Sequence, residues 1–125
     1  MRGLLFITLL VVACSGEVRA QDAVAGEKVF AVCKACHQIG AGAKNRSGPQ
    51  LNGILGRRLG SVDEFVYSKG FKAASEKGRV WDEAEMTAFL TKPRAYMKGT
   101  KMNFAGLKKK TDLEAIIAYL KSAGE

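Results

Sequence analysis

The pattern of apolar and polar residues along this chain is mainly that of α-helices. Near the C-terminus the apolar side chains recur three and four residues apart, at Leu113, Ile116, Ile117 and Leu120. This spacing places them on one face of a helix. Thr111 and Glu114 have the spacing of a capping box, and Gly124 follows the last apolar position. A helix is therefore expected from about 111 to 124.

Three more helices are expected ahead of this one. Segment 22–33 opens with Asp22 as a capping residue, and segment 82–92 opens with Asp82, carries Glu85 three residues later and ends before Pro93. A shorter helix is expected over 67–74. Alternating runs of β-branched residues are not evident, so strands are not expected.

Two long stretches, 40–60 and 98–110, show neither the helical spacing of apolar residues nor the alternation typical of strands. Loops of this length are uncommon in a compact domain unless something else orders them. The chain has 125 residues, enough for one domain, and a domain this small often needs a staple beyond its own apolar core. We expect a single all-α domain whose core is completed by another component.

The first twenty residues have the layout of a secretory signal peptide. Arg2 is followed by an apolar run over 4–13 and by small residues at 18 and 20. The run is too short to span a bilayer. We expect 1–20 to be cleaved and 21–125 to form a soluble periplasmic domain. Cleavage before Cys14, leaving an acylated and membrane-tethered N-terminus, remains an alternative.

The sequence Cys33-Lys34-Ala35-Cys36-His37 has the Cys-x-x-Cys-His pattern of c-type haem attachment. Two thiols three positions apart on a tight turn can reach the two vinyl groups of one porphyrin, and the adjacent imidazole can then face the iron. His37 is the only histidine of the chain. We predict one covalent haem c on Cys33 and Cys36, with His37 as an axial ligand.

Other uses of paired cysteines fit less well. A thioredoxin-like site normally lies in a βαβ unit, and a structural zinc site needs four ligands where only Cys33, Cys36 and His37 are at hand. A disulfide between Cys33 and Cys36 would close almost no loop.

The second axial ligand is predicted to be Met102. Met86 falls inside the expected helix 82–92, where a core role is expected, and Met97 directly follows Tyr96 and is expected to be core or partly exposed. Met102 lies in the loop 98–110, which otherwise has no reason to be ordered; a purely structural role is the alternative. With both axial positions filled, the haem would exchange electrons and would not bind substrates, so no enzyme activity is expected. A haem enzyme or ligand sensor would require Met102 to dissociate.

These motifs resemble the class I c-type cytochromes, in particular the cytochrome c2 type that is close to mitochondrial cytochrome c. The resemblance covers nearly all of 21–125. The residues that carry it are 26–30, 33–37, 48–53, 56, 57, 81, 93, 96, 99–102, 104–110 and 118–120.

The resemblance implies the small class I cytochrome c fold, with three to five helices and long loops wrapped around one haem. The first and last helices would cross where Gly26 meets the face that carries Ile116 and Tyr119. The carbonyl of Pro49 would accept a hydrogen bond from the second nitrogen of His37, which fixes the ring.

The family also places several residues near the haem propionates, namely Arg57, Tyr67, Trp81 and Thr100. Ordinary packing and surface charge is the alternative for the first three. Two positions depart from the family pattern, since Phe89 replaces a usual tyrosine and Ala74 replaces a frequent asparagine. Both changes remove polar groups near the haem, so an altered reduction potential and alkaline stability are expected.

The chain has a formal net charge of +8. The basic residues expected near the haem edge are Lys34, Arg94, Lys98, Lys101, Lys108, Lys109 and Lys110. Without other information, these basic residues would be interpreted as a solvated surface. Nucleic-acid binding is a poor alternative for an exported chain that has no recognition motif. The resemblance implies that the protein is a monomer and that these basic residues dock on acidic patches of redox partners. The donor would be a cytochrome bc1 complex, and the acceptor a photosynthetic reaction centre or a respiratory terminal oxidase.

Overall fold

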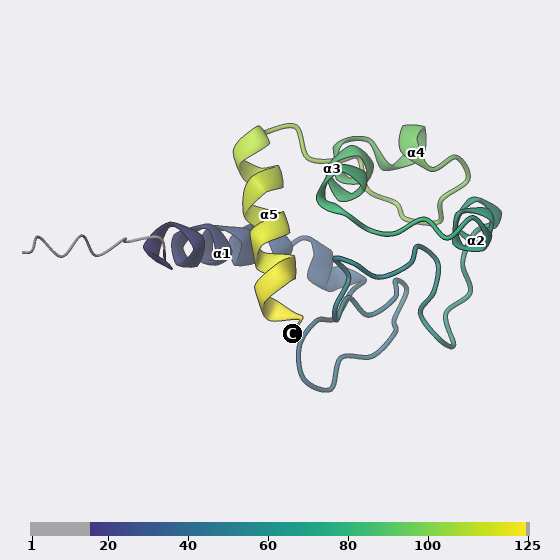
Figure 1. Cartoon of the computed structure of the whole chain (residues 1–125), viewed down its shortest axis with the longest axis horizontal. Helices are drawn as coiled ribbons and strands as arrows, with labels where there is room; N and C mark the ends of the chain where they lie inside the picture. The colour runs from purple at the N-terminus through teal and green to yellow at the C-terminus, as the bar shows by residue number, and fades with distance from the viewer. Residues whose placement is uncertain (1–15, 125) are drawn as a thin grey trace, which may run out of the picture.

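The computed structural model describes residues 16–124, so most of the expected leader, with Cys14, lies outside the described residues. The helices are α1 (Gly16–Phe30), the 3₁₀ turn η1 (Cys33–Ala35), α2 (Lys69–Glu76), α3 (Glu83–Thr91), α4 (Pro93–Tyr96) and α5 (Lys110–Ala123). Figure 1 shows them linked by long irregular segments. Over 16–124 the only β-type pairing is an isolated bridge between Arg58 and Val80. The all-α prediction is confirmed.

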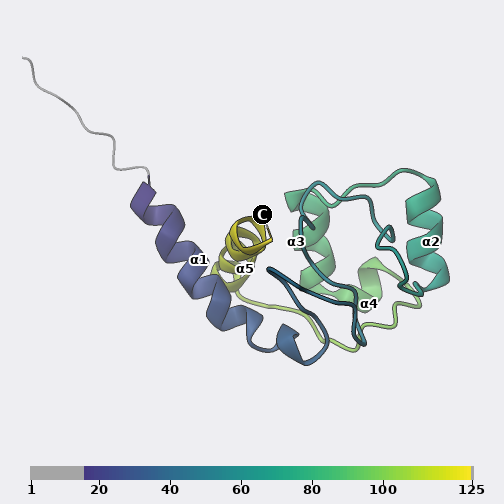
Figure 2. The same cartoon turned by 90° about the horizontal axis from the view of Figure 1, so that it is seen from below.

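The first and last helices cross, as expected. Figures 1 and 2 show α5 lying across α1. Gly26 makes the close approach possible, because a β-carbon there would overlap the carbonyl of Ala115 and lie 2.6 Å from the β-carbon of Tyr119. Beside it the rings of Phe30 and Tyr119 pack with centroids 5.1 Å apart.

Two helix starts are capped by side chains, and one of these caps was predicted. The Asp82 carboxylate accepts a hydrogen bond from the Glu85 N–H (2.7 Å) at the start of α3, which confirms that cap. Ser68 caps α2 by accepting from the Phe71 N–H (3.4 Å), so this helix begins two residues later than predicted. As expected, α3 ends before Pro93, but Pro93 then begins the unpredicted α4.

Two predicted helix boundaries are wrong. The first helix begins at Gly16 and not at Asp22, because no proline or glycine follows Gly16 to stop the helix before Asp22; it also ends at Phe30, before the cysteines. The last helix begins at Lys110 with no side-chain cap. Its Leu113 N–H bonds to the Lys109 carbonyl (3.2 Å), so the Thr111 capping box is absent and Thr111 lies within the helix.

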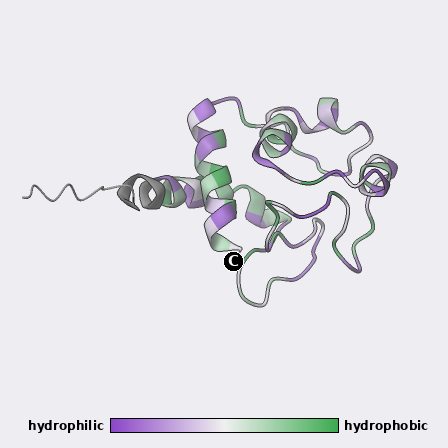
Figure 3. Ribbon diagram, viewed as in Figure 1, coloured by the Kyte–Doolittle hydropathy of each residue, from purple (hydrophilic) through white to green (hydrophobic). Residues whose placement is uncertain are grey.

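The core is built from one face of α5 and from an aromatic cluster. Figure 3 shows hydrophobic and hydrophilic residues alternating along α5, and its buried side chains are Leu113, Ala115, Ile116, Ile117 and Leu120. In the aromatic cluster, the ring centroid of Phe89 lies 5.6 Å from that of Phe71 and 5.2 Å from that of Trp81. No helix of the described chain is long and apolar enough to cross a bilayer.

Candidate functional site

The cysteine motif lies directly after α1. Its backbone turns tightly, since the N–H groups of Cys36 and His37 both donate to the Cys33 carbonyl (3.0 and 2.9 Å). The Cys33 side chain is half-buried and that of Cys36 is exposed, and both thiols are free. Burial, and to a lesser degree the neighbouring Cys36, raises the pKa of the Cys33 thiol. A redox-active dithiol has the opposite shift, so the thioredoxin-like alternative loses support.

The imidazole of His37 is held on one side by a backbone carbonyl. Its Nδ1 lies 2.7 Å from the oxygen of Pro49. A carbonyl can only accept, so Nδ1 carries the proton and Nε2 keeps a lone pair. Burial lowers the pKa of the ring, with a smaller lowering from Arg57, while the bond to Pro49 raises it. A neutral imidazole with its Nε2 lone pair free is the form that binds iron.

Gly48 lies directly against this ring. A β-carbon built on Gly48 would overlap the imidazole and come within 2.7 Å of Nδ1 and 2.8 Å of Nε2. The Gly48 N–H donates to the Cys36 carbonyl (2.9 Å). Two consecutive loop residues, Gly48 and Pro49, therefore fix the orientation of His37 relative to the cysteines.

Hydrogen bonds brace the loop that carries Pro49. Asn52 bonds both backbone groups of Gly40 (2.7 and 2.9 Å). The guanidinium of Arg57 donates to the carbonyls of Asn52 (2.8 Å) and Gln50 (3.0 Å). The sequence analysis also missed Asn45, whose amide bonds the Gln50 N–H (3.0 Å) and the Asp63 carbonyl (2.9 Å); asparagines in long loops often take this role.

Three of the residues expected near the propionates lie close together. The backbone N–H of Trp81 donates to the Arg57 carbonyl (2.9 Å). Arg57 and Tyr67 lie near enough for each to influence the pKa of the other. The Tyr67 hydroxyl accepts from the Val62 N–H (3.3 Å). The fourth, Thr100, lies beside the loop methionine: its Oγ1 accepts from the Met102 N–H (3.3 Å).

The three methionines differ in burial. Met86 and Met97 are 4% and 5% exposed and belong to the core. Met97 is confined further, since a β-carbon on Gly70 would lie only 2.8 Å from its sulfur. Met102 is half-buried and packs on the edge of the core, as Cys33, Leu51 and Tyr67 do. Free thiols, an imidazole nitrogen with a lone pair and a thioether are groups that c-type haem sites use.

The predicted basic residues are all exposed. Some are engaged within the chain: Arg94 donates to the Asn103 amide oxygen (2.6 Å), Lys101 to the Val66 carbonyl (3.2 Å), and Lys110 pairs with Glu114 (3.0 Å). Lys34, Lys98, Lys108 and Lys109 make no ion pair or side-chain hydrogen bond among the described residues.

The Cytochrome c family profile matches residues 23–124. The chain belongs to this family and is a class I c-type cytochrome of the cytochrome c2 type. The resemblance inferred from the sequence is confirmed. Members of the family carry electrons on one covalently attached haem c and are not enzymes, and the same holds for this chain.

Individual relatives agree with this assignment. The chain is 52% identical over 98 residues to cytochrome c2 of Afifella marina, an alignment that covers 78% of this chain and 79% of that protein. It is 47% identical over 97 residues to cytochrome c-550 of Ancylobacter novellus, covering 78% and 91%. The solved structure of cytochrome cH from Methylobacterium extorquens superposes with a TM-score of 0.72 at 41% identity, covering 81% of this chain and 98% of that one.

Proposed function

We propose that this chain is a diffusible periplasmic carrier of single electrons whose haem c is attached through Cys33 and Cys36 and ligated by His37 and Met102. The observation that carries the proposal is the 2.7 Å contact between His37 Nδ1 and the Pro49 oxygen. It leaves Nε2 available next to two free thiols. When bound, the haem supplies an iron that accepts and returns one electron.

The chain's own residues would keep the two oxidation states alike. Gly48 and Pro49 fix the imidazole, and Thr100 fixes the backbone of Met102. With the same two ligands held in both states, little rearrangement accompanies each transfer. A thioether is a soft ligand, so Met102 is expected to raise the reduction potential above that of a bis-histidine haem.

Optical spectroscopy tests the ligand assignment. In ferric protein, Met102→Ala should abolish the weak red band that marks sulfur–iron ligation and should let carbon monoxide bind after reduction. Met86→Leu is the matched control, because Met86 is a buried core methionine of α3; it should keep the band. Pigment released by acid–acetone extraction, or a red band retained in Met102→Ala, would refute the assignment.

We also propose that the exposed basic residues around Lys101 and Lys108 dock acidic surfaces of membrane redox complexes. The donor would be a cytochrome bc1 complex, and the acceptor a photosynthetic reaction centre or a terminal oxidase. Residues 1–20 would direct the chain to the periplasm and be removed there, with lipidation of Cys14 as the alternative. Mass spectrometry of the mature N-terminus separates these two outcomes.

The docking proposal predicts a strong dependence on salt, because exposed charges are screened within about 10 Å at 0.1 M ionic strength. Lys108→Glu should slow reduction by an isolated bc1 complex at low salt. Lys77→Glu makes the same charge change at an exposed position after α2 and should have a smaller effect. Rates that stay flat as ionic strength rises would contradict electrostatic docking.

A further inference from the structure

The segment that carries Met102 begins at a very short helix. α4 spans only Pro93–Tyr96 and has no side-chain cap. One helical turn has little stability of its own, so the position of α4, and of the loop that leaves it, depends on contacts with other elements.

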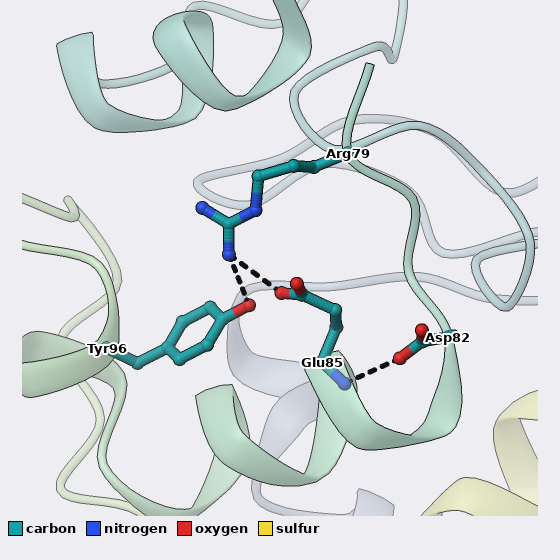
Figure 4. Close-up of polar contacts among 4 residues, drawn as sticks. All are labelled: Arg79, Asp82, Glu85 and Tyr96. Atoms are coloured by element: carbon teal, nitrogen blue, oxygen red, sulfur yellow. Dashed lines mark hydrogen bonds and ion pairs between the residues drawn. The ribbon is translucent and has the colours of Figure 1, made fainter. Parts of the chain in front are cut away.

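Three side chains from three parts of the chain meet at the end of this helix (Figure 4). Arg79, from the loop after α2, donates through one guanidinium nitrogen to the Tyr96 hydroxyl (2.6 Å) and to the Glu85 carboxylate (2.8 Å). Its guanidinium carbon also lies 5.4 Å from the centroid of the Tyr96 ring. The side chains of Arg79 and Glu85 are 37% and 28% exposed, so solvent screens this pair less than a fully exposed one.

Glu85 is itself held in place. Its backbone N–H bonds the Asp82 cap (2.7 Å), which fixes the first turn of α3. The Tyr96 ring of α4 packs edge-on against Phe89 of α3, with centroids 6.0 Å apart. Tyr96 thus contacts α3 directly through its ring, and its hydroxyl is joined to Glu85 of α3 through Arg79.

Short-range contacts then lead from Tyr96 to Met102. The next residue, Met97, is buried against Gly70. The Thr100 N–H donates to the Met97 carbonyl (3.1 Å), and the Met102 N–H donates to Thr100 Oγ1 (3.3 Å). Any shift of Tyr96 away from α3 therefore reaches the residue proposed as ligand within six positions.

We propose that Arg79, Glu85 and Tyr96 form a clamp that holds the Met102 loop against the haem and limits how often the thioether leaves the iron. They are positioning residues and do not touch the iron. The inference rests on the proposed ligation by Met102. Opening would release the Met102 thioether from the bound haem and let an added ligand take its place, with no change of oxidation state.

Binding of imidazole to the ferric holoprotein measures this opening. An added ligand binds only the open form, so its apparent affinity rises in proportion to the open fraction. Tyr96→Phe removes one hydrogen bond to a charged donor and should raise the affinity about fivefold or more, followed as loss of the red band. Glu85→Gln keeps the shape but not the charge and should give a smaller rise, about twofold. The imidazole affinity of Arg79→Lys should stay closer to the wild-type value than that of Arg79→Gln.

Two matched variants control for chemistry unrelated to the clamp. Tyr119→Phe removes a hydroxyl at the crossing of α1 and α5, and Glu114→Gln removes a carboxylate from a surface ion pair of α5. Both should bind imidazole like the wild type.

The outcomes separate the clamp from the ligand assignment. If Tyr96→Phe and Arg79→Gln bind imidazole with wild-type affinity, or if they only lower the midpoint of denaturant unfolding, the clamp is refuted while Met102 remains the ligand. A wild-type ferric protein without the red band would instead overturn the ligation, and the clamp with it.

Discussion

Gly26 of α1 and Ala115 of α5 lie so close that no β-carbon fits between the two helices. The neighbour in the way is a backbone carbonyl, which cannot rotate aside. Gly26→Ala should therefore destabilise the protein by about 3 kcal/mol, measured by denaturant unfolding. Ala25→Ser, on an exposed position of the same helix, should cost about 0.5 kcal/mol. Equal effects of the two substitutions would mean that the crossing is loosely packed.

Gly48 poses a similar restriction at the functional site. Gly48→Ala should push the imidazole of His37 out of line with Pro49, because the added carbon would overlap the ring. We expect a lower yield of holoprotein and a shifted reduction potential. Gly42→Ala is the control: Gly42 has a φ of 73° but nothing within 4 Å of its β-position. It should cost about 1 kcal/mol of stability without changing the potential.

Phe89 is expected, from the resemblance described above, to stand where tyrosine is usual. The ring is 6% exposed and packs between Phe71, Trp81 and Tyr96, so an added hydroxyl would enter an apolar cluster. Phe89→Tyr should shift the reduction potential measurably by placing a dipole near the haem, and should cost about 1 to 3 kcal/mol if the hydroxyl finds no partner. Redox titration and denaturant unfolding measure the two effects. An unchanged potential would remove Phe89 from the residues that tune the haem.

Tyr67 should make the fold sensitive to alkaline pH. Burial raises its pKa above the ordinary 10.0, although the Val62 N–H and Arg57 oppose the shift. Between about pH 10 and the folded-state pKa, the unfolded chain has lost the phenolic proton and the folded chain retains it, so the free energy of unfolding falls as pH rises. Tyr67→Phe should flatten this alkaline slope. The loss of the bond to Val62 should lower stability by about 1 kcal/mol at every pH, so the slope, and not the offset, is the test.

Glu64 is the only described residue other than glycine with a positive φ, at 60°. A left-handed conformation costs an L-residue about 1 to 2 kcal/mol, while glycine loses about 0.5 to 1 kcal/mol more in chain entropy on folding. Glu64→Gly should therefore stabilise the protein by about 0.5 to 1 kcal/mol in thermal or denaturant unfolding. Asp63→Gly, at the preceding position where φ is not positive, should be destabilising. A loss of stability in Glu64→Gly would show that its side chain makes a contact worth more than the strain.

Local sequence signals predicted the elements whose stability is local. Asp82 and Glu85 mark the start of α3 because their bonds lie within one turn, and the Cys33 to His37 pattern needs no distant partner. The start of α5 was misplaced because Thr111 satisfied the capping pattern, whereas Lys109 supplies the first carbonyl.

Contacts between distant residues were not predictable in the same way. The bonds from Arg79 to Tyr96 and from Asn45 to Asp63 join residues 17 and 18 positions apart. No periodicity relates such pairs, and an arginine in a loop is most often solvated. The role of Gly26 at the helix crossing was predicted only from the resemblance to the family. A glycine within a helix does not by itself show which other segment of backbone it contacts.

The crossing of α1 and α5 also bears on how the protein is made. Among the described residues these two helices are the first and the last, so their interface can form only after Lys110–Ala123 has been synthesised. Until then the face of α1 that bears Phe30 has no partner, and the adjoining thiols of Cys33 and Cys36 remain in an incomplete fold. On the proposed attachment of haem through these two thiols, the attachment segment therefore stays accessible in an incomplete fold until the C-terminal helix arrives.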